Sequence, residues 1–105
     1  MNFSIIYPKD IEQLRREKRA LLIDIRSEEE YKKGHWKDAL NYPEEETADY
    51  SRVLGKTRFL ILYCQHGGSS MQLARTLGKM GYSVGTVIGG YEAMKKFQES
   101  YFKNL

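Results

Sequence analysis

The sequence predicts an α/β fold built on a parallel β-sheet. Short apolar runs alternate along the chain with segments of helical periodicity, and this alternation is typical of parallel sheets. The run Phe59–Tyr63 is apolar throughout, which is expected for a strand buried on both faces. It stops at Cys64, and a helical pattern begins after five polar or glycine residues. The cysteine is therefore expected at the carboxyl end of a strand, where open parallel sheets bind their ligands.

The other strands are expected where further short apolar runs occur. They cover residues 3–7, 20–25 and 83–88, with a brief strand within 35–43 that Pro43 closes. Gly89 and Gly90, after the last of these runs, are expected to form a backbone turn.

Capping residues and periodic apolar positions indicate the helices. Pro8 and Asp10 open the first one, and Ser27 caps an acidic helix over 28–33 that Gly34 ends. A further helix is expected around Tyr50, Val53 and Leu54. The next helix runs from Ser69 or Ser70 to Gly81 and has one apolar face, formed by Leu73, Ala74, Leu77 and Met80. The last helix covers 91–97, and a loosely packed tail is expected after Ser100.

Length and composition predict one domain over residues 1–105. With 41% hydrophobic and 30% charged residues, the chain is expected to be neither disordered nor fibrous. The net charge is +3, but positive and negative residues are mixed along the chain, so no nucleic-acid-binding stripe is predicted. A mildly positive protein suits a small anionic substrate. The sequence leaves the oligomeric state open.

Cysteine usage and hydropathy indicate the compartment. Cys64 is the only cysteine, so no disulfide can form within the chain and no cysteine pair can hold a metal. The first residues do not resemble a signal peptide, and no apolar run approaches membrane-spanning length. A cytoplasmic protein without membrane contact is expected, and nothing in the sequence calls for a cofactor or a metal.

The loop after Cys64 has the composition of an anion-binding cup. A helix beginning near Ser69 or Ser70 would direct unpaired N–H groups and the positive end of its dipole at the loop, which favours a thiolate. Gly67 and Gly68 can turn tightly and leave backbone amides facing a guest atom. The alternative is that Cys64 is a small buried hydrophobic residue, the usual role of a free cysteine. The glycine pair, the serine pair and the helix start favour a nucleophile.

Four motifs together resemble the rhodanese-like family, in particular its single-domain sulfurtransferases. The stretch 22–26 looks like the strand that ends in Asp-x-Arg, here Asp24-Ile25-Arg26. The stretch 30–43 is similar to Glu-Tyr-x-x-Gly-His-Ile-x-Gly-Ala-x-Asn-Ile-Pro, 63–70 looks like the active-site loop, and 81–94 resembles the last strand with its Gly-Gly turn. The four occur in the family's order and spacing and cover nearly the whole chain.

The resemblance implies a fold and an activity. The fold would be a rhodanese-like open parallel sheet of about five strands with helices on both faces. Cys64 would take a sulfane sulfur from a donor such as thiosulfate, hold it as a persulfide and pass it to cyanide or a thiol. The loop residues Gln65, His66, Gly67, Gly68, Ser69 and Ser70 would bind the substrate, their amides holding the terminal sulfur as an anion.

The chain departs from the family pattern at three positions. Many members that use thiosulfate carry Arg or Lys where this loop has Ser69, so a cation for the sulfonate is missing from the loop. Trp36 stands where Ile is common and Met94 where Trp is common, and we interpret both as packing changes.

Several charged or histidine residues near these motifs could have either a functional or a purely structural role. His66 could donate to substrate or simply lie exposed in the loop, and His35 is expected to be buried and hydrogen-bonded. Asp24, Arg26 and Glu30 could form an ion-pair set that supports the loop.

Two other functions compete with sulfur transfer. A cysteine phosphatase or arsenate reductase needs Cys-x5-Arg, and Ser70 stands at the arginine position. A non-catalytic rhodanese-like module that binds a partner or senses sulfur is the remaining alternative, and the presence of Cys64 weighs against it.

Overall fold

The computed structural model describes residues 2–45, 50 and 55–103. Its five strands form one parallel sheet in the order β1-β5-β4-β2-β3. The strands are β1 (Ser4–Ile6), β2 (Leu21–Asp24), β3 (Leu40–Asn41), β4 (Leu60–Tyr63) and β5 (Val84–Val87). The predicted parallel α/β fold is thus confirmed.

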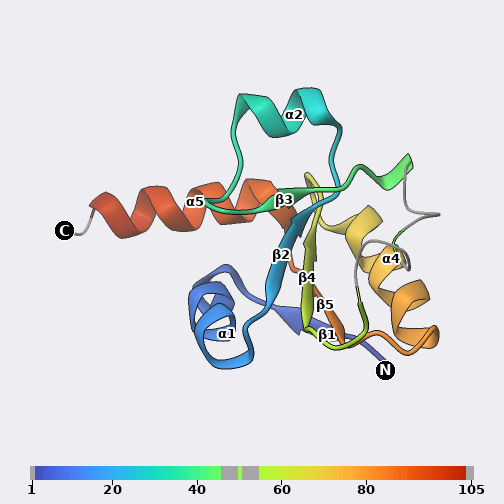
Figure 1. Ribbon diagram of the computed structural model, residues 1–105. Helices are drawn as coiled ribbons and strands as arrows, with labels where there is room; N and C mark the ends of the chain where they lie inside the picture. Colours follow the sequence, from blue (N-terminus) through green and yellow to red (C-terminus); the bar gives the residue numbers. More distant parts are fainter. Residues whose placement is uncertain (1, 46–49, 51–54, 104–105) are drawn as a thin grey trace.

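Helices lie on both faces of the sheet (Figure 1). A 3-10 turn η1 (Pro8–Asp10) leads into α1 (Ile11–Lys18), and α1 and α5 (Gly90–Lys103) cover one face while α4 (Gly68–Lys79) covers the other. The short helix α2 (Glu28–Lys33) follows β2. The Ser27 side chain accepts a hydrogen bond from the Glu30 amide and Gly34 follows the last turn, so the predicted cap and end of α2 are confirmed.

The central strand β4 supplies side chains to both cores. Leu60 and Leu62 pack with Ala74 and Leu77 of α4, whereas Ile61 and Tyr63 pack on the opposite face with residues that include Met94 of α5. All four strand side chains are fully buried, as the continuous apolar run predicts. Because β2 and β5 pair with β4 on either side, the end of β4 lies in the middle of the sheet.

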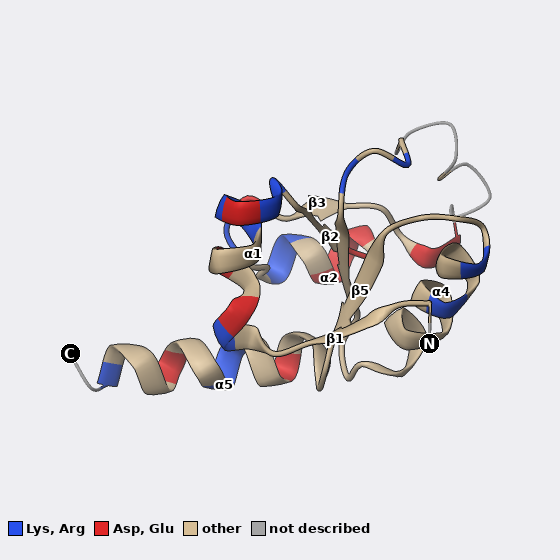
Figure 2. Cartoon of the chain, turned by 90° about the horizontal axis from the view of Figure 1, so that it is seen from below, with Lys and Arg blue, Asp and Glu red and all other residues tan. Residues whose placement is uncertain are grey.

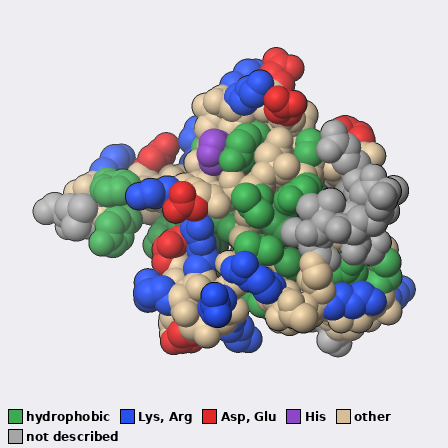
Figure 3. Space-filling view, viewed as in Figure 1, with side chains coloured by type: hydrophobic (Ala, Val, Ile, Leu, Met, Phe, Trp, Pro, Cys, Tyr) green, Lys and Arg blue, Asp and Glu red, His purple; other side chains and the backbone are tan. Residues whose placement is uncertain are grey.

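The helices differ from the prediction at their ends. α5 runs to Lys103 rather than stopping at residue 97, because residues 98–103 contain neither Gly nor Pro. Its last turns project beyond the body of the protein (Figure 1), and hydrophobic side chains lie on the surface of this projecting part (Figure 3). Tyr101 and Phe102 of these turns are exposed. Met80 was predicted on the inward face of α4. It is 49% exposed, because α4 ends one residue before it.

Part of the predicted helix around Tyr50, Val53 and Leu54 lies outside the described residues. Tyr50 itself is helical and buried, and its hydroxyl donates to the Tyr42 carbonyl at 2.7 Å. Charges of both signs are interspersed over the surface helices, as the mixed sequence pattern indicates (Figure 2). Among the residues placed by the structure, no helix is long and apolar enough to cross a membrane.

Candidate active site

Cys64 directly follows β4 and is 8% exposed. Its thiol is held at the start of α4. The amides of Gly67 and Ser70 donate to Sγ at 3.1 and 3.4 Å, and Sγ lies 3.4 Å from Ser70 Oγ. Two backbone donors at the positive end of a helix therefore face the sulfur, an arrangement that stabilises negative charge on it.

The backbone conformation of Gly67 allows the loop amides to lie close to Sγ of Cys64. Gly67 caps α4 with φ +106, in the left-handed region that favours glycine. A Cβ on Gly67 would lie 3.1 Å from the Gly89 amide, so the cysteine loop packs directly on the Gly89-Gly90 turn.

The remaining loop residues make no hydrogen bond to the sulfur, whose donors are Gly67 and Ser70. Ser69 and Gly68 are both exposed, and a Cβ built on Gly68 would meet no described residue within 4 Å. In the first turn of α4 their amides have no intrahelical acceptor. His66 is 74% exposed, and its Nδ1 lies 2.7 Å from a Glu92 carboxylate oxygen.

Ser70 connects the loop to the sheet. Its hydroxyl lies 2.7 Å from Thr86 Oγ1 of β5, and both residues are fully buried. Thr86 lies in the middle of a predicted buried strand, and nothing in the sequence indicated that its hydroxyl would contact the cysteine loop.

The Gly89-Gly90 turn brings a second helix N-terminus to the loop. The amide of Tyr91 donates to the Cys64 carbonyl at 2.8 Å, and that of Glu92 donates to the Gln65 carbonyl at 3.2 Å. The first turn of α5 thus satisfies the two carbonyls that begin the loop. The sequence indicated a turn here but not its contact with the cysteine.

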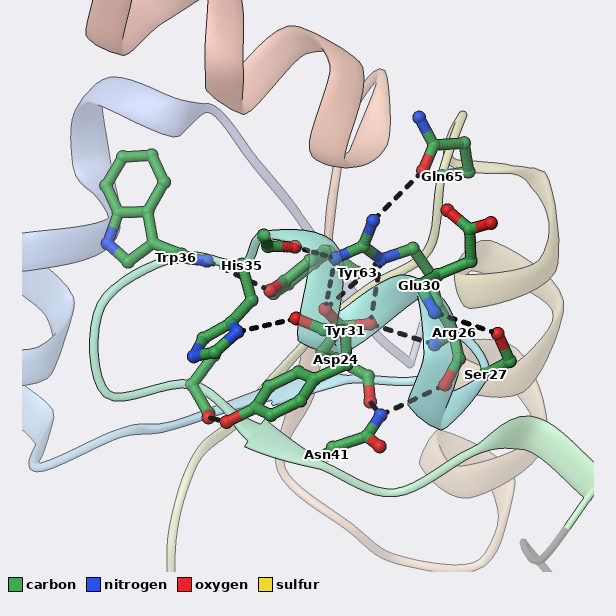
Figure 4. A network of polar contacts seen from close by, with 12 residues as sticks. Asp24, Arg26, Ser27, Glu30, Tyr31, His35, Trp36, Asn41, Tyr63 and Gln65 are labelled. Atoms are coloured by element: carbon green, nitrogen blue, oxygen red, sulfur yellow. Dashed lines mark hydrogen bonds and ion pairs between the residues drawn. The ribbon is translucent and has the colours of Figure 1, made fainter.

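A buried ion pair between Asp24 and Arg26 contacts the cysteine loop through Gln65 (Figure 4). Asp24 is fully buried, and its carboxylate accepts from Arg26 Nη2 at 2.7 Å and from Arg26 Nε at 3.0 and 3.1 Å. Arg26 also donates to the Gly34 carbonyl at 2.6 Å and to Gln65 Oε1 at 3.1 Å. Asp24 and Arg26 form the predicted pair, and through Gln65 it reaches the residue after the cysteine.

Glu30 lies outside this pair. Its carboxylate is 3.9 Å from Lys33 Nζ and half exposed, so the predicted three-residue set reduces to Asp24 and Arg26. Burial lowers the pKa of Arg26, but the hydrogen bond and charge of Asp24 outweigh that effect and raise it overall. Arg26 therefore stays charged beside the loop.

Tyr63 and His35 complete the surroundings. Burial, together with the nearby Asp24 carboxylate, raises the pKa of Tyr63 well above its ordinary range, and its hydroxyl accepts from the Trp36 amide at 3.2 Å. The prediction of a buried His35 is wrong, because the ring stacks on the outer face of Tyr31 at 3.7 Å and remains exposed. Its hydrogen bond exists: Nδ1 lies 2.8 Å from the Tyr31 carbonyl.

Within the described ranges no group of three His, Cys, Asp or Glu residues could hold a metal ion. The chemistry that these residues can carry is that of a thiolate held among backbone donors.

A cysteine placed after the central strand of this sheet, inside a loop of backbone amides, is the arrangement that the sequence motifs led us to expect of a rhodanese-like domain. The chain belongs to that family: the model of the rhodanese-like domain matches residues 7–97. The expected membership is thereby confirmed.

Sequence relatives point in the same direction. The chain is 33% identical over 86 residues to thiosulfate sulfurtransferase GlpE of Pseudomonas syringae pv. syringae, covering 81% of each chain. It is 32% identical over 76 residues to thiosulfate sulfurtransferase GlpE of Coxiella burnetii, covering 71% of each. A solved rhodanese-related protein from Thermoplasma volcanium superimposes with a TM-score of 0.81 at 20% identity, covering 90% of this chain and 92% of that one.

Proposed function

We propose that the protein is a sulfurtransferase that moves a sulfane sulfur through a persulfide on Cys64. The donor is thiosulfate or a persulfide, and the acceptor is cyanide or a thiol. The observation that carries the proposal is the pair of amides, from Gly67 and Ser70, directed at Sγ. The sulfurtransferase relatives support the reaction class.

In the first half-reaction the Cys64 thiolate attacks the outer sulfur of thiosulfate. The bond between that sulfur and the sulfonate breaks, sulfite leaves with the electron pair, and the cysteine carries a persulfide anion. The new terminal sulfur lies further into the loop, where the free amides of the first turn of α4, those of Gly68 and Ser69, can hold its charge. The loop from Gln65 to Ser70 is the binding site for this sulfur.

In the second half-reaction a nucleophile attacks the terminal sulfur and Cys64 leaves as a thiolate. The same amides that hold the starting thiolate stabilise this leaving group, so both half-reactions use one site, as in covalent catalysis. A single thiol that works in its reduced form suits a reducing compartment such as the cytoplasm.

Mass spectrometry of the intact protein tests the proposal. After incubation with thiosulfate the wild-type chain should gain one sulfur atom, which cyanide should remove as thiocyanate. Cys64→Ser should gain none, because the chain has no other cysteine. A wild-type chain that gains no sulfur from thiosulfate or from a persulfide would overturn the proposal and favour a non-catalytic module.

A further inference from the structure

A pocket of about 180 Å³ opens beside the cysteine loop and is separate from the amides that face the sulfur. Three parts of the chain line it: the region around α2, the loop itself and the start of α5. The lining residues are Arg26, Glu30, Lys33, Gly34, Gln65, Tyr91 and Lys95. Arg26, Glu30 and Gln65 lie together at this edge in the close view (Figure 4).

The pocket begins one residue from the nucleophile. Gln65 follows Cys64 directly, and its carboxamide is held by Arg26 at 3.1 Å. Tyr91 is hydrogen-bonded through its amide to the Cys64 carbonyl. A molecule that occupies the pocket and extends over Gln65 would therefore bring its other end to the loop that holds the sulfur.

The charges in this pocket favour an anion. The charge of Arg26 is already matched by buried Asp24. Lys95 makes no ion pair with any residue that the structure describes, and Lys33 contacts Glu29 and Glu30 only at 3.8 and 3.9 Å while 66% exposed. Among the described residues that line the pocket, Glu30 is the only carboxylate, so Lys33 and Lys95 together leave one positive charge in excess.

The cysteine loop has no such charge of its own. Residues 64–70 include neither Lys nor Arg, so a charged group on a substrate has to be matched from outside the loop. Thiosulfate carries its sulfonate directly on the transferred sulfur, so its negative charge stays beside that sulfur. A thiol whose carboxylate lies several bonds from its sulfur places that charge further away, on the side of Gln65 and the pocket.

We propose that the pocket selects an acceptor thiol that carries a carboxylate, with Lys95 and Lys33 holding that group. The inference rests on the proposed function and names its substrate class. In the transfer step the acceptor thiolate attacks the terminal sulfur of the Cys64 persulfide. The bond between the two enzyme-bound sulfurs breaks, Cys64 leaves as a thiolate, and the acceptor departs as its own persulfide with no external oxidant or reductant.

Two acceptors that differ only in charge give the test. The protein is first loaded with thiosulfate and freed of excess donor, and single-turnover transfer is then followed with N-acetylcysteine and with N-acetylcysteine amide. The ratio of the two rate constants is compared between proteins, because intrinsic thiol reactivity cancels in that comparison. Lys95→Gln should lower the ratio by about two- to fivefold, the effect of a partly exposed charge pair. Adding Lys33→Gln should lower it further, and Lys95→Arg should restore it.

Lys79→Gln is the matched control. It removes the same charge at the far end of α4, about 16 Å along the helix from its start. An unchanged ratio in Lys79→Gln together with a lower ratio in Lys95→Gln supports the proposal. An equal ratio in all variants, or an equal fall in Lys79→Gln, overturns it. Failure of the sulfurtransferase function itself is recognised earlier, because the wild-type chain would then gain no sulfur.

Discussion

The amide of Tyr91 donates a 2.8 Å hydrogen bond to the carbonyl oxygen of Cys64, which fixes the first turn of α5 to the candidate nucleophile. At the same residue the first turn of α4 holds the thiol through the Ser70 amide. Two helix N-termini from opposite faces of the sheet therefore meet at one cysteine. The loop is fixed through its backbone, so its geometry depends on the close approach of Gly90 more than on any side chain.

Gly90→Ala should destabilise the protein and disrupt the loop. A Cβ there would lie 2.5 Å from the Cys64 carbonyl oxygen and 2.8 Å from the Gln65 carbonyl, at φ +62. The strain and the clash should lower the free energy of unfolding by about 2 kcal/mol or more in urea titrations. Sulfur loading of Cys64 should fall with it.

Gly55→Ala is the control for that substitution. Among the residues that the structure describes, the nearest atom to a Cβ on Gly55 would be the Thr57 hydroxyl oxygen at 3.7 Å, an ordinary van der Waals distance. The free energy of unfolding of this variant should stay within about 0.5 kcal/mol of wild type. Equal stability of both variants would show that the Gly90 contact relaxes at little cost.

Tyr63 should make the protein sensitive to alkaline pH. Burial raises the pKa of its hydroxyl far above the ordinary value of about 10, so the unfolded chain releases this proton before the folded chain does. The corresponding stability is fully present below about pH 10 and is lost above it, at about 1.4 kcal/mol per pH unit.

Tyr63→Phe removes this titration. The variant should lose about 1 kcal/mol at pH 7, because the Trp36 amide loses its acceptor, but its stability should decline less steeply above pH 10. Urea unfolding at a series of pH values measures both effects. Parallel declines in the two proteins would show that the tyrosine hydroxyl ionises equally in both states.

The sequence was sufficient to predict what depends on local pattern. The apolar run ending at Cys64 predicts a buried central strand, and the glycine and serine pairs predict a helix start within one or two residues of Gly68. It could not predict contacts between distant segments. The bonds from Tyr91 to Cys64 and from Ser70 to Thr86 depend on how β5 lies beside β4, which no local pattern specifies.

The exposure of His35 was missed for a related reason. Its ring packs on Tyr31, one helical turn earlier, and this satisfies its hydrogen bond at the surface. A motif position indicates that a polar partner is needed but not whether the partner is buried. The pocket beside Gln65 was likewise beyond prediction, because Lys33 and Lys95 are far apart in the sequence and are brought together only by the fold.

Ser69→Arg should improve thiosulfate binding if the missing loop cation limits it. Ser69 is exposed in the first turn of α4, in the loop that would bind thiosulfate, so an arginine here would add a cation to that loop. A charged hydrogen bond contributes roughly 1.5–3 kcal/mol, and less when it is open to water, so the KM for thiosulfate should fall by about three- to thirtyfold. A cation at a helix N-terminus should also cost about 0.3–1 kcal/mol of stability.

Three measurements decide how this result is interpreted. The reduction in the KM for thiosulfate should become smaller as salt rises, because the added interaction is electrostatic. The turnover rate should change less, since the arginine would contact the leaving end of the donor in the ground state and in the transition state alike. If the KM of the folded variant stays flat, either another residue already holds the sulfonate or thiosulfate is not the natural donor. Single-turnover transfer from glutathione persulfide separates these two cases, because a persulfide donor has no sulfonate. If thiosulfate is not the natural donor, the rate of transfer from glutathione persulfide should far exceed the rate from thiosulfate. If another residue already holds the sulfonate, it should not.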